Sequence, residues 1–448
     1  MAKRGARRQI PHRALPAASA GTAAEIAAEP NPLKKAGKIL GPGFITGASD
    51  DDPSGIGTYA VAGASLGLQT LWMALLTFPL MAAVQNICAR LGLVSGQGLA
   101  GVLRDHYPRA ILYGSVLLLF GANTINVGAD LGAIADAVHS LTDVQAVWLV
   151  IPVAIGILVL QVFGSYRLIA NTFKWLTLAL LAYVVDVFIV HPDLLETLRA
   201  TVVPTFSLEP AYVTALVAIL GTTISPYLFF WQSSEEIEEQ IEIGRTTRAS
   251  RRGATPAELR YSAMDVNVGM GFSNLVMYFI ILATAATLFK AGQTNIQSAA
   301  DAAVALEPLA GPAAKVLLAV GLIGAGFLAV PILTGSAAYA VAETFGWKFG
   351  LNRRPGRARP FYGVIVVASL VGMLINFLGI NPIDALFWTA VLNGLLAPPL
   401  LVLIMLVANS KRVMGKHTNG RWINVLGWGA TAAMFAAAAG LLLTWGQA

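Results

Sequence analysis

Eleven apolar segments, each long enough to cross a bilayer as a helix, most constrain how this 448-residue chain can fold. A membrane-spanning helix needs about 20 mostly apolar residues. The segments lie at residues 38–66, 69–93, 109–138, 145–164, 166–190, 209–234, 264–289, 313–344, 360–380, 382–408 and 423–445. Only 12% of residues are charged, about half the usual share in a soluble domain. The pattern excludes a soluble enzyme and predicts an all-α polytopic membrane protein.

The positive charges predict the orientation of the spans. All but three of the 30 Lys and Arg residues fall in the N-terminal tail or on one side of the predicted spans; the exceptions are Arg199, Lys290 and Lys315. Positively charged loops stay cytoplasmic. We therefore expect a multi-pass protein of the plasma (inner) membrane with a cytoplasmic N-terminus and an external C-terminus. The net charge of +6 reports topology, and no basic–aromatic interleaving indicates a nucleic-acid partner.

Two of the eleven spans are interrupted by polar and helix-breaking residues. The first carries Asp50–Gly55 in its middle, and the sixth carries Thr222–Pro226. They open two successive sets of five spans, 36–190 and 209–408, and because five is odd the second set is inverted. Matched broken helices in inverted repeats indicate a transporter with its substrate site at the midplane. Residues 1–35 are expected to be a disordered cytoplasmic tail, and 423–445 a peripheral eleventh span.

The breaks offer oxygen ligands. Proline lacks an N–H, so Pro53 frees the carbonyl of Ser49 and Pro226 frees that of Thr222. Proline also displaces the preceding residue from helical geometry; these residues carry oxygen and are Asp52 and Ser225. Carbonyl, hydroxyl and carboxylate oxygens suit Mg²⁺, Mn²⁺ or Ca²⁺.

Three consecutive carboxylates in one span need a partner. Each costs roughly 2.5–3.5 kcal/mol or more near the bilayer centre if ionised. Successive helical residues point about 100° apart, so all three cannot face one ion. Asp52 lies at the break and is predicted to be the ligand, with Asp50 and Asp51 in the vestibule or behind the ligands. Alternatively, all three lie in a wet loop that attracts cations without specificity.

At these residues the chain resembles the Nramp family of divalent-metal transporters. Its GPGF motif is Gly41–Phe44, and Asp52–Gly55 (DPSG) stands where the family has DPGN. Further matching segments lie at Met81–Gly96, around Asp130, at Asp265-Val266 and Asn274, and near Lys411 and Asn419. The resemblance covers about residues 36–445. It implies a LeuT-like 5+5 inverted-repeat fold with spans 1 and 6 unwound, and inward transport of a divalent cation.

The departures from the family pattern change the expected substrate. The family's Asn ligand is Gly55 here, its Met ligand is Ser225, and its sixth-span His is Tyr227. A thioether favours softer transition metals, so its loss, with that of Asn, leaves a harder and roomier site. Magnesium keeps several waters when bound. The chain therefore looks like the Nramp-related magnesium-transporter branch, with Mn²⁺ as a second substrate.

The same departures bear on proton coupling. Tyr227 replaces the family's His, and Ala133 replaces its acidic residue three positions after Asp130. All five histidines lie in the tail, in loops or at span ends, so none remains at the centre to titrate near neutral pH. We expect uptake driven by the membrane potential without protons. The rival is a proton-coupled Mn²⁺/Fe²⁺ symporter of the main Nramp type.

Other polar residues leave alternatives open. Four glutamates near the end of the sixth span (Glu235, Glu236, Glu238 and Glu239) are either a solvated helix end or an inner vestibule; Glu235 and Glu239 share one face. Asp130 and Asp136 are either remnants of the family's charge relay or satisfied polar groups. Asn274 either orients the unwound sixth span or bonds a neighbouring helix. Ser54 and Tyr227 are placed near the site, and Asn393 stands near the family's tenth-span glutamine.

Other classes of protein fit less well. An intramembrane enzyme needs a nucleophile or metal constellation, and the central spans contain no His. An amino-acid symporter would place its substrate's carboxylate against three Asp residues. A channel is less consistent with broken helices in inverted repeats, which favour alternating access. We expect a transporter that is not an enzyme, holds no cofactor, carries Mg²⁺ or Mn²⁺ as substrate, and works in the lipid bilayer as a monomer.

Overall fold

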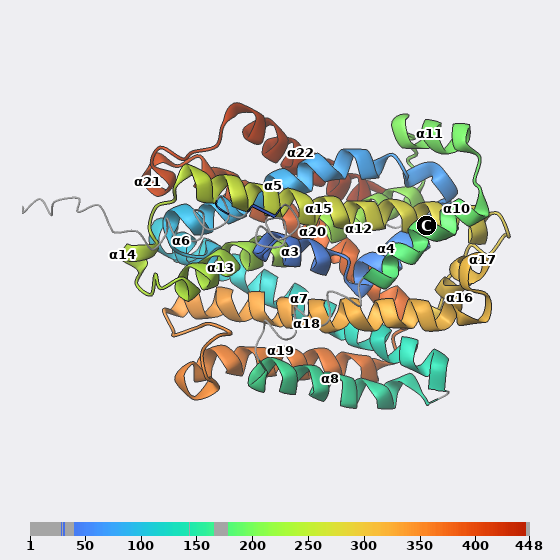
Figure 1. The fold of residues 1–448 in the computed structure, drawn as a ribbon, viewed down its shortest axis with the longest axis horizontal. Helices are drawn as coiled ribbons and strands as arrows, with labels where there is room; N and C mark the ends of the chain where they lie inside the picture. Colours follow the sequence, from blue (N-terminus) through green and yellow to red (C-terminus); the bar gives the residue numbers. More distant parts are fainter. Residues whose placement is uncertain (1–27, 29, 32–39, 143, 165–177, 445–448) are drawn as a thin grey trace, which may run out of the picture.

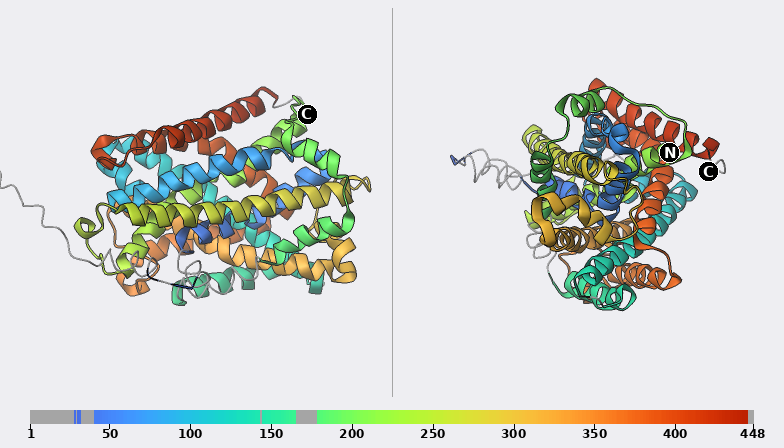
Figure 2. Two further views of the ribbon diagram at one scale, coloured as in Figure 1. Left: turned by 45° about the horizontal axis from the view of Figure 1, so that its top comes forward. Right: turned by 90° about the vertical axis from the view of Figure 1, so that its right-hand side faces the viewer.

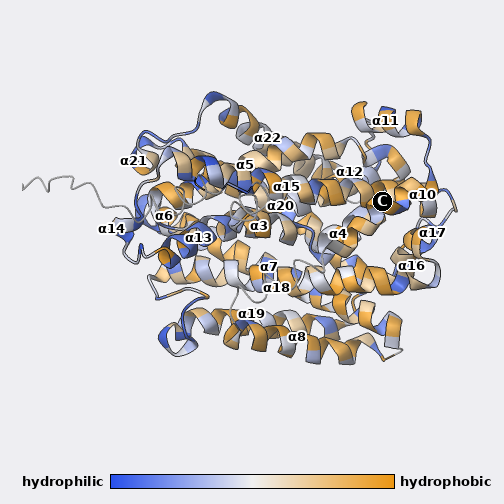
Figure 3. Ribbon diagram, viewed as in Figure 1, coloured by the Kyte–Doolittle hydropathy of each residue, from blue (hydrophilic) through white to orange (hydrophobic). Residues whose placement is uncertain are grey.

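The computed structural model describes residues 28, 30–31, 40–142, 144–164 and 178–444. Within them, long helices run side by side along one axis and no strand occurs (Figures 1 and 2). Hydrophobic residues dominate the middle of the bundle, and hydrophilic residues gather toward its two ends (Figure 3). Nine helices of this described part are long and apolar enough to cross a membrane. The predicted all-α polytopic class is confirmed.

The long uninterrupted helices are α5 (Met73–Ser95), α7 (Arg109–Thr142), α8 (Ala146–Phe163), α15 (Pro256–Thr284), α18 (Ala314–Phe345), α19 (Arg359–Ile375), α20 (Pro382–Ala408) and α22 (Arg421–Thr444). Two spans are split, into α3 (Pro42–Asp50) with α4 (Pro53–Leu66), and α12 (Pro210–Thr223) with α13 (Pro226–Glu242). Shorter helices are α6 (Leu99–His106), α10 (Ala182–Val190), α11 (Leu194–Val202), α14 (Arg248–Arg251), α16 (Ala299–Ala303), α17 (Glu307–Ala310) and α21 (Lys411–Met414).

Most predicted span boundaries lie within a few residues of the helices. The seventh span, α15, begins at Pro256 rather than at the predicted residue 264. Thr255 and Glu258 form a reciprocal capping box, which starts the helix ahead of the apolar run. The first half of the predicted fifth span, residues 166–177, lies outside the described residues; the other half, 178–190, is described and includes α10. The tail, 1–35, also lies almost wholly outside them. The eleventh span, α22, runs along one edge of the bundle (Figure 2).

The broken first span is anchored to α15 at its start. The carboxylate of Asp265 in α15 accepts N–H bonds from three residues of the GPGF motif: Gly41 (2.8 Å), Gly43 (2.6 Å) and Phe44 (2.9 Å). The first N–H groups of a helix have no partner within the helix, so Asp265 caps α3. Farther along, a Cβ added to Gly47 would lie 2.2 Å from the backbone of Gly269. The two backbones therefore touch, and α3 is fixed against α15.

Replacing Asp265 with alanine is expected to destabilise the protein. The change leaves three N–H groups at the start of α3 without their acceptor, and each unsatisfied buried group costs about 1–3 kcal/mol. The midpoint of thermal unfolding in detergent should fall clearly below that of the parent. Asp384→Ala, on an exposed residue of α20, is the control. An Asp265→Ala midpoint equal to that of the control would contradict the capping role.

Candidate functional site

The first and sixth spans break where the sequence predicts. α3 ends at Asp50 and α4 starts at Pro53, with Asp51 and Asp52 between them. α12 ends at Thr223 and α13 starts at Pro226. Proline suits the first position of a helix, because its missing N–H would have no helical partner there. Each proline thus ends one half-helix and begins the next.

Both freed carbonyls accept a hydrogen bond from a hydroxyl group. Tyr227 Oη donates to the carbonyl of Ser49 at 2.9 Å, a bond that joins the sixth-span break to the first. Ser225 Oγ lies 2.7 Å from the carbonyl of Thr222 and 2.8 Å from that of Gly221. Its hydroxyl is therefore turned back onto α12, the half-helix that precedes it. The structure thus brings Ser49 and Tyr227 together across the two breaks.

Asp52 lies where three helices meet. Its Oδ1 accepts the N–H of Gly55 at 2.7 Å, which caps α4. Its Oδ2 accepts from Asn126 Nδ2 at 3.2 Å, on α7, and lies 3.4 Å from Tyr227 Oη, on α13. The residue is only 2% exposed. Of the three consecutive aspartates, Asp52 is the one that accepts from α7 and lies beside a hydroxyl of α13, whose single proton it shares with the Ser49 carbonyl.

Asp50 and Asp51 are fully buried beside α15. Ser273 Oγ lies 2.8 Å from Asp50 Oδ2 and 3.1 Å from Asp51 Oδ1, and its single proton can serve one of them at a time. The other oxygens, Asp50 Oδ1 and Asp51 Oδ2, have no hydrogen-bond partner in the part of the chain that the structure describes. Burial contradicts the alternative of three aspartates in a wet loop.

Within the described ranges, no group of three or more His, Cys, Asp or Glu side chains is placed to hold one metal ion. The sequence argument that the three aspartates cannot face one ion agrees with this arrangement. A cation at the breaks would therefore take Asp52 as a carboxylate ligand together with carbonyl, hydroxyl or amide oxygens. Asn126 Oδ1 is one such oxygen, since it is buried and has no hydrogen-bond partner among the described residues.

Gly55 has less space around it than the sequence suggests. A Cβ added there would lie 3.1 Å from the carbonyl oxygen of Asp50 and 3.2 Å from Thr222 Oγ1. The expected roomier site is therefore not seen at this position, because Thr222 and the end of α3 close over it. Ser54 points elsewhere: its hydroxyl donates to the carbonyl of Leu386 on α20 at 2.9 Å. Its hydroxyl therefore joins α4 to α20 and does not bond the groups around Asp52.

The glutamates of α13 are mostly not a solvated helix end. Glu235, Glu236 and Glu238 are buried, whereas Glu239 is exposed. Glu236 accepts from Ser262 at 2.8 Å and from Gln232 at 3.1 Å. The solvated interpretation is wrong for three of the four, because neighbouring helices cover this end of α13. The vestibule interpretation of Glu235 and Glu239 stays a prediction.

The remaining predicted residues differ in whether their polar groups have hydrogen-bond partners. Asp130 is fully buried on α7 near Asp52; the N–H of Ser54 lies close by, but neither carboxylate oxygen has a well-aligned donor among the described residues. Asp136, in contrast, accepts the N–H of Ala299 at 2.7 Å. Asn274 donates to the carbonyl of Ala74 and accepts from Thr77. It therefore bonds α5, as the second alternative holds. Asn393 is buried in α20.

Two residues that the sequence analysis missed contact the aspartates: Asn126 and Ser273. Asn126 lies four residues before Asp130, so it shares a helical face with it. That spacing was the available clue. Ser273 lies next to Asn274 in a polar pair within an apolar span, and nothing local tells which of the two faces the break.

Comparison with known proteins decides the family. The family model described as "Natural resistance-associated macrophage protein-like" (Nramp) matches residues 43–444. The chain belongs to the Nramp family. It is 28% identical over 400 residues to the divalent metal cation transporter MntH of Klebsiella pneumoniae, and this alignment covers 87% of this chain and 90% of the relative. It is 26% identical over 397 residues to MntH of Bacillus subtilis, covering 87% and 88%.

Solved structures agree on the fold. A manganese transporter of Eremococcus coleocola has a TM-score of 0.71 at 19% identity, over 93% of this chain and 88% of that one. MhsT in complex with L-phenylalanine has a TM-score of 0.58 at 13% identity, over 89% and 98%. The expected LeuT-like fold of this Nramp protein is confirmed. Its relatives are named as transporters, which agrees with the interpretation that it is not an enzyme.

Proposed function

We propose that this Nramp protein is a secondary transporter that takes up divalent cations by alternating access, with Mg²⁺ as preferred substrate and Mn²⁺ as a second one. The relatives named as divalent metal cation transporters support cation transport. The observation that carries the Mg²⁺ preference is the chemistry around Asp52, where the neighbouring polar groups are amide, hydroxyl and carbonyl groups. Mg²⁺ is a hard cation that prefers oxygen ligands.

The proposed ligands are the Asp52 carboxylate and the carbonyls of Ser49 and Thr222, with Ser225 and Gly55 at the two remaining family ligand positions. The hydroxyls of Tyr227 and Ser225 now bond those carbonyls. Each carbonyl oxygen has two lone pairs, so an ion could share it or displace the hydroxyl. Asp50, Asp51 and the buried Glu235 would attract the cation along its path. The two inverted repeats would be 36–190 and 209–408.

The proposed setting is the plasma membrane, with the N-terminus inside and the C-terminus outside, and a monomer as the working unit. The arginine-rich elements α6, α14 and α21 lie together at one end of the bundle, opposite α11, α16 and α17, which carry a single arginine, Arg199 (Figure 1). Positively charged segments stay cytoplasmic, which supports this orientation. Cysteine labelling of substitutions at Arg252 and Lys290 from outside intact cells tests it: only the Lys290 position should react.

Uptake of Mg²⁺ is expected to follow the membrane potential and not the pH gradient. Two charges that cross 100 mV gain about 4.6 kcal/mol, so the membrane potential alone suffices to drive uptake. Without proton coupling, the rate in proteoliposomes should change by less than about twofold when the pH gradient is collapsed at fixed potential. A potassium diffusion potential sets the voltage, and dyes report internal Mg²⁺ and pH. Internal acidification in step with Mg²⁺ entry would contradict uncoupled transport.

The second candidate, a proton-coupled Mn²⁺/Fe²⁺ symporter, is favoured by Asp130. This carboxylate is buried near Asp52 and has no well-aligned hydrogen-bond donor among the described residues. Such a group could carry a proton beside the metal. If acidification accompanies uptake, Asp130→Asn should abolish it, and Asp136→Asn, whose parent carboxylate bonds Ala299, should not.

A further inference from the structure

A second polar site lies at the arginine-bearing end of the bundle, away from the helix breaks. Three segments meet there: the connection from α5 to α6 together with α6, the region of α14, and α21. They enclose a cavity of about 330 Å³, which is within the size range of small-ligand pockets. Its polar lining is Ser95, Gln97, Asp105, His106, Arg248, Arg252 and Arg412.

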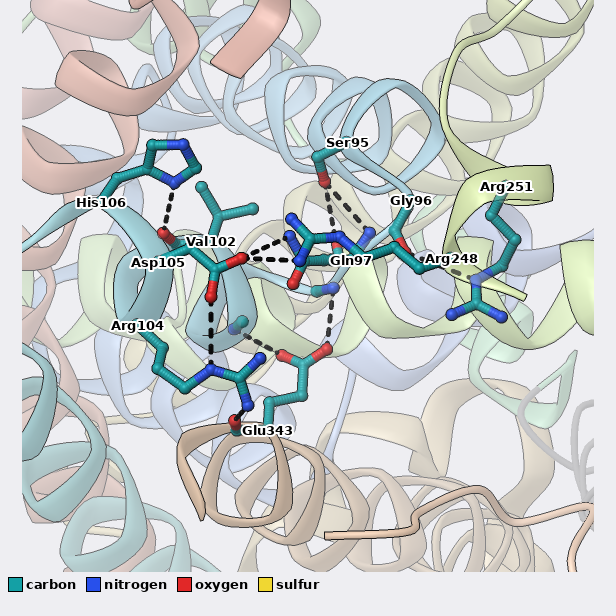
Figure 4. Close-up of polar contacts among 12 residues, drawn as sticks. Ser95, Gly96, Gln97, Val102, Arg104, Asp105, His106, Arg248, Arg251 and Glu343 are labelled. Carbon is teal, nitrogen blue, oxygen red and sulfur yellow. Dashed lines mark hydrogen bonds and ion pairs between the residues drawn. The ribbon is translucent and has the colours of Figure 1, made fainter. Parts of the chain in front are cut away.

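One arginine of this cavity already has a partner. Arg248 Nη1 lies 2.8 Å from Asp105 Oδ2, which also accepts from Gln97 Nε2 at 3.3 Å. Figure 4 shows these groups converging between α6 and α14. Partial burial would raise the pKa of Asp105, but the bonds from Gln97 and Arg248 lower it below its usual value. Asp105 also lies 3.4 Å from Arg104 Nε, outside the cavity lining, so its negative charge is already paired with two arginines.

The other two arginines are not balanced. Among the residues that the structure describes, the guanidinium groups of Arg252 and Arg412 form no hydrogen bond and no ion pair, and both side chains are exposed at the cavity. They come from segments about 160 residues apart in the chain. The cavity thus has more positive than negative charge and presents two unpaired planar donors.

Hydrogen bonds fix the segments that carry the cavity. Ser95 Oγ donates to the carbonyl of Gln97 and accepts its N–H. On the adjoining side, Glu343 of α18 accepts the N–H groups of Gly98 and Gly101 at 2.8 and 3.0 Å, which caps the start of α6 (Figure 4). Arg251 binds the carbonyl of Gly96. These contacts hold α6 and α14 in place without using Arg252 or Arg412.

We propose that this cavity binds a phosphate group, with Arg252 and Arg412 as its principal ligands and Arg248 as a third. Guanidinium groups bind phosphate oxygens through paired N–H donors. The phosphate belongs to a soluble phosphate compound or to an anionic lipid headgroup, since basic cytoplasmic pockets bind headgroups as well. Occupancy would bridge α6, α14 and α21. The site does not depend on which cation the protein transports.

The test measures binding of pyrophosphate, without metal, to the full chain in neutral detergent by titration calorimetry. We expect binding that weakens with salt and falls at least tenfold, about 1.4 kcal/mol, in Arg252→Gln/Arg412→Gln. Arg260→Gln, on an exposed residue of α15 outside the cavity, is the matched control and should bind as the parent does. Among the described residues, neither substituted side chain of the double variant has a hydrogen bond or ion pair to lose, so folding should persist.

A parallel arm distinguishes the two sources of the phosphate. Nanodiscs of phosphatidylcholine with and without phosphatidylglycerol are compared for retained lipid by mass spectrometry. Enrichment of phosphatidylglycerol in the parent but not in the double variant, without pyrophosphate binding, assigns the site to a lipid headgroup. Failure of both ligands to bind, or equal binding by the double variant and Arg260→Gln, would overturn the proposal.

Discussion

Replacing Asp52 with asparagine is expected to lower Mg²⁺ uptake at least about 100-fold, because a divalent ion about 4 Å from a carboxylate gains on the order of 8 kcal/mol at an effective dielectric constant near 20. Each 1.4 kcal/mol is about tenfold in binding, so a fraction of that energy suffices. Asparagine is also a good N-cap. It keeps an oxygen for the N–H of Gly55, and the start of α4 should persist. Uptake into proteoliposomes under a fixed potential measures the effect.

The matched control is Asp51→Asn, one residue away. Asp51 is as buried as Asp52, but it bonds Ser273 on α15 rather than α7 and α13. Its neutralisation should slow uptake much less than that of Asp52. If the Asp51 variant loses uptake and the Asp52 variant transports normally, the ligand has been assigned to the wrong aspartate. If both variants transport normally, the site does not lie at the first break.

The breaks could be predicted from the sequence because proline acts locally. Pro53 and Pro226 each remove one hydrogen bond and displace one residue wherever the rest of the chain lies. The carbonyls they free could be named for the same reason. The groups that donate to those carbonyls could not all be predicted, because Tyr227 donates to Ser49 across 178 positions of sequence. A contact of that length depends on how the two repeats pack.

Burial of acidic groups was equally hard to predict. Glu235, Glu236 and Glu238 lie within four residues of one another at the polar end of a helix, a pattern that usually indicates exposure to solvent. In the structure they are covered by other helices, including α15, where Ser262 donates to Glu236. The capping of α3 by Asp265 is a contact between segments 221 or more positions apart. Helical periodicity gives the face of a residue but not the neighbour that covers it.

Introducing the family's two missing ligands, as Gly55→Asn with Ser225→Met, is expected to shift selectivity from Mg²⁺ toward Mn²⁺ by about tenfold or more, since one added soft ligand need contribute only about 1.4 kcal/mol. Ser225 now donates its hydroxyl to the carbonyl of Thr222. Methionine has no such donor, so the change frees that carbonyl and adds a thioether beside it. At Gly55 the Asp50 carbonyl and Thr222 must yield by a few tenths of an ångström to admit a Cβ. Competition of Mn²⁺ against Mg²⁺ uptake in proteoliposomes measures the ratio.

The control that isolates the sulfur is Gly55→Asn with Ser225→Leu. Leucine is close to methionine in volume and likewise removes the hydroxyl that bonds the Thr222 carbonyl, but it offers no soft ligand. The leucine variant should therefore keep its preference for Mg²⁺ while the methionine variant changes. An equal shift in both would show that space or the freed carbonyl, and not ligand softness, sets the selectivity. A third variant, Gly55→Asn with Ser225→Ala, separates these two, because it frees the carbonyl without filling the space.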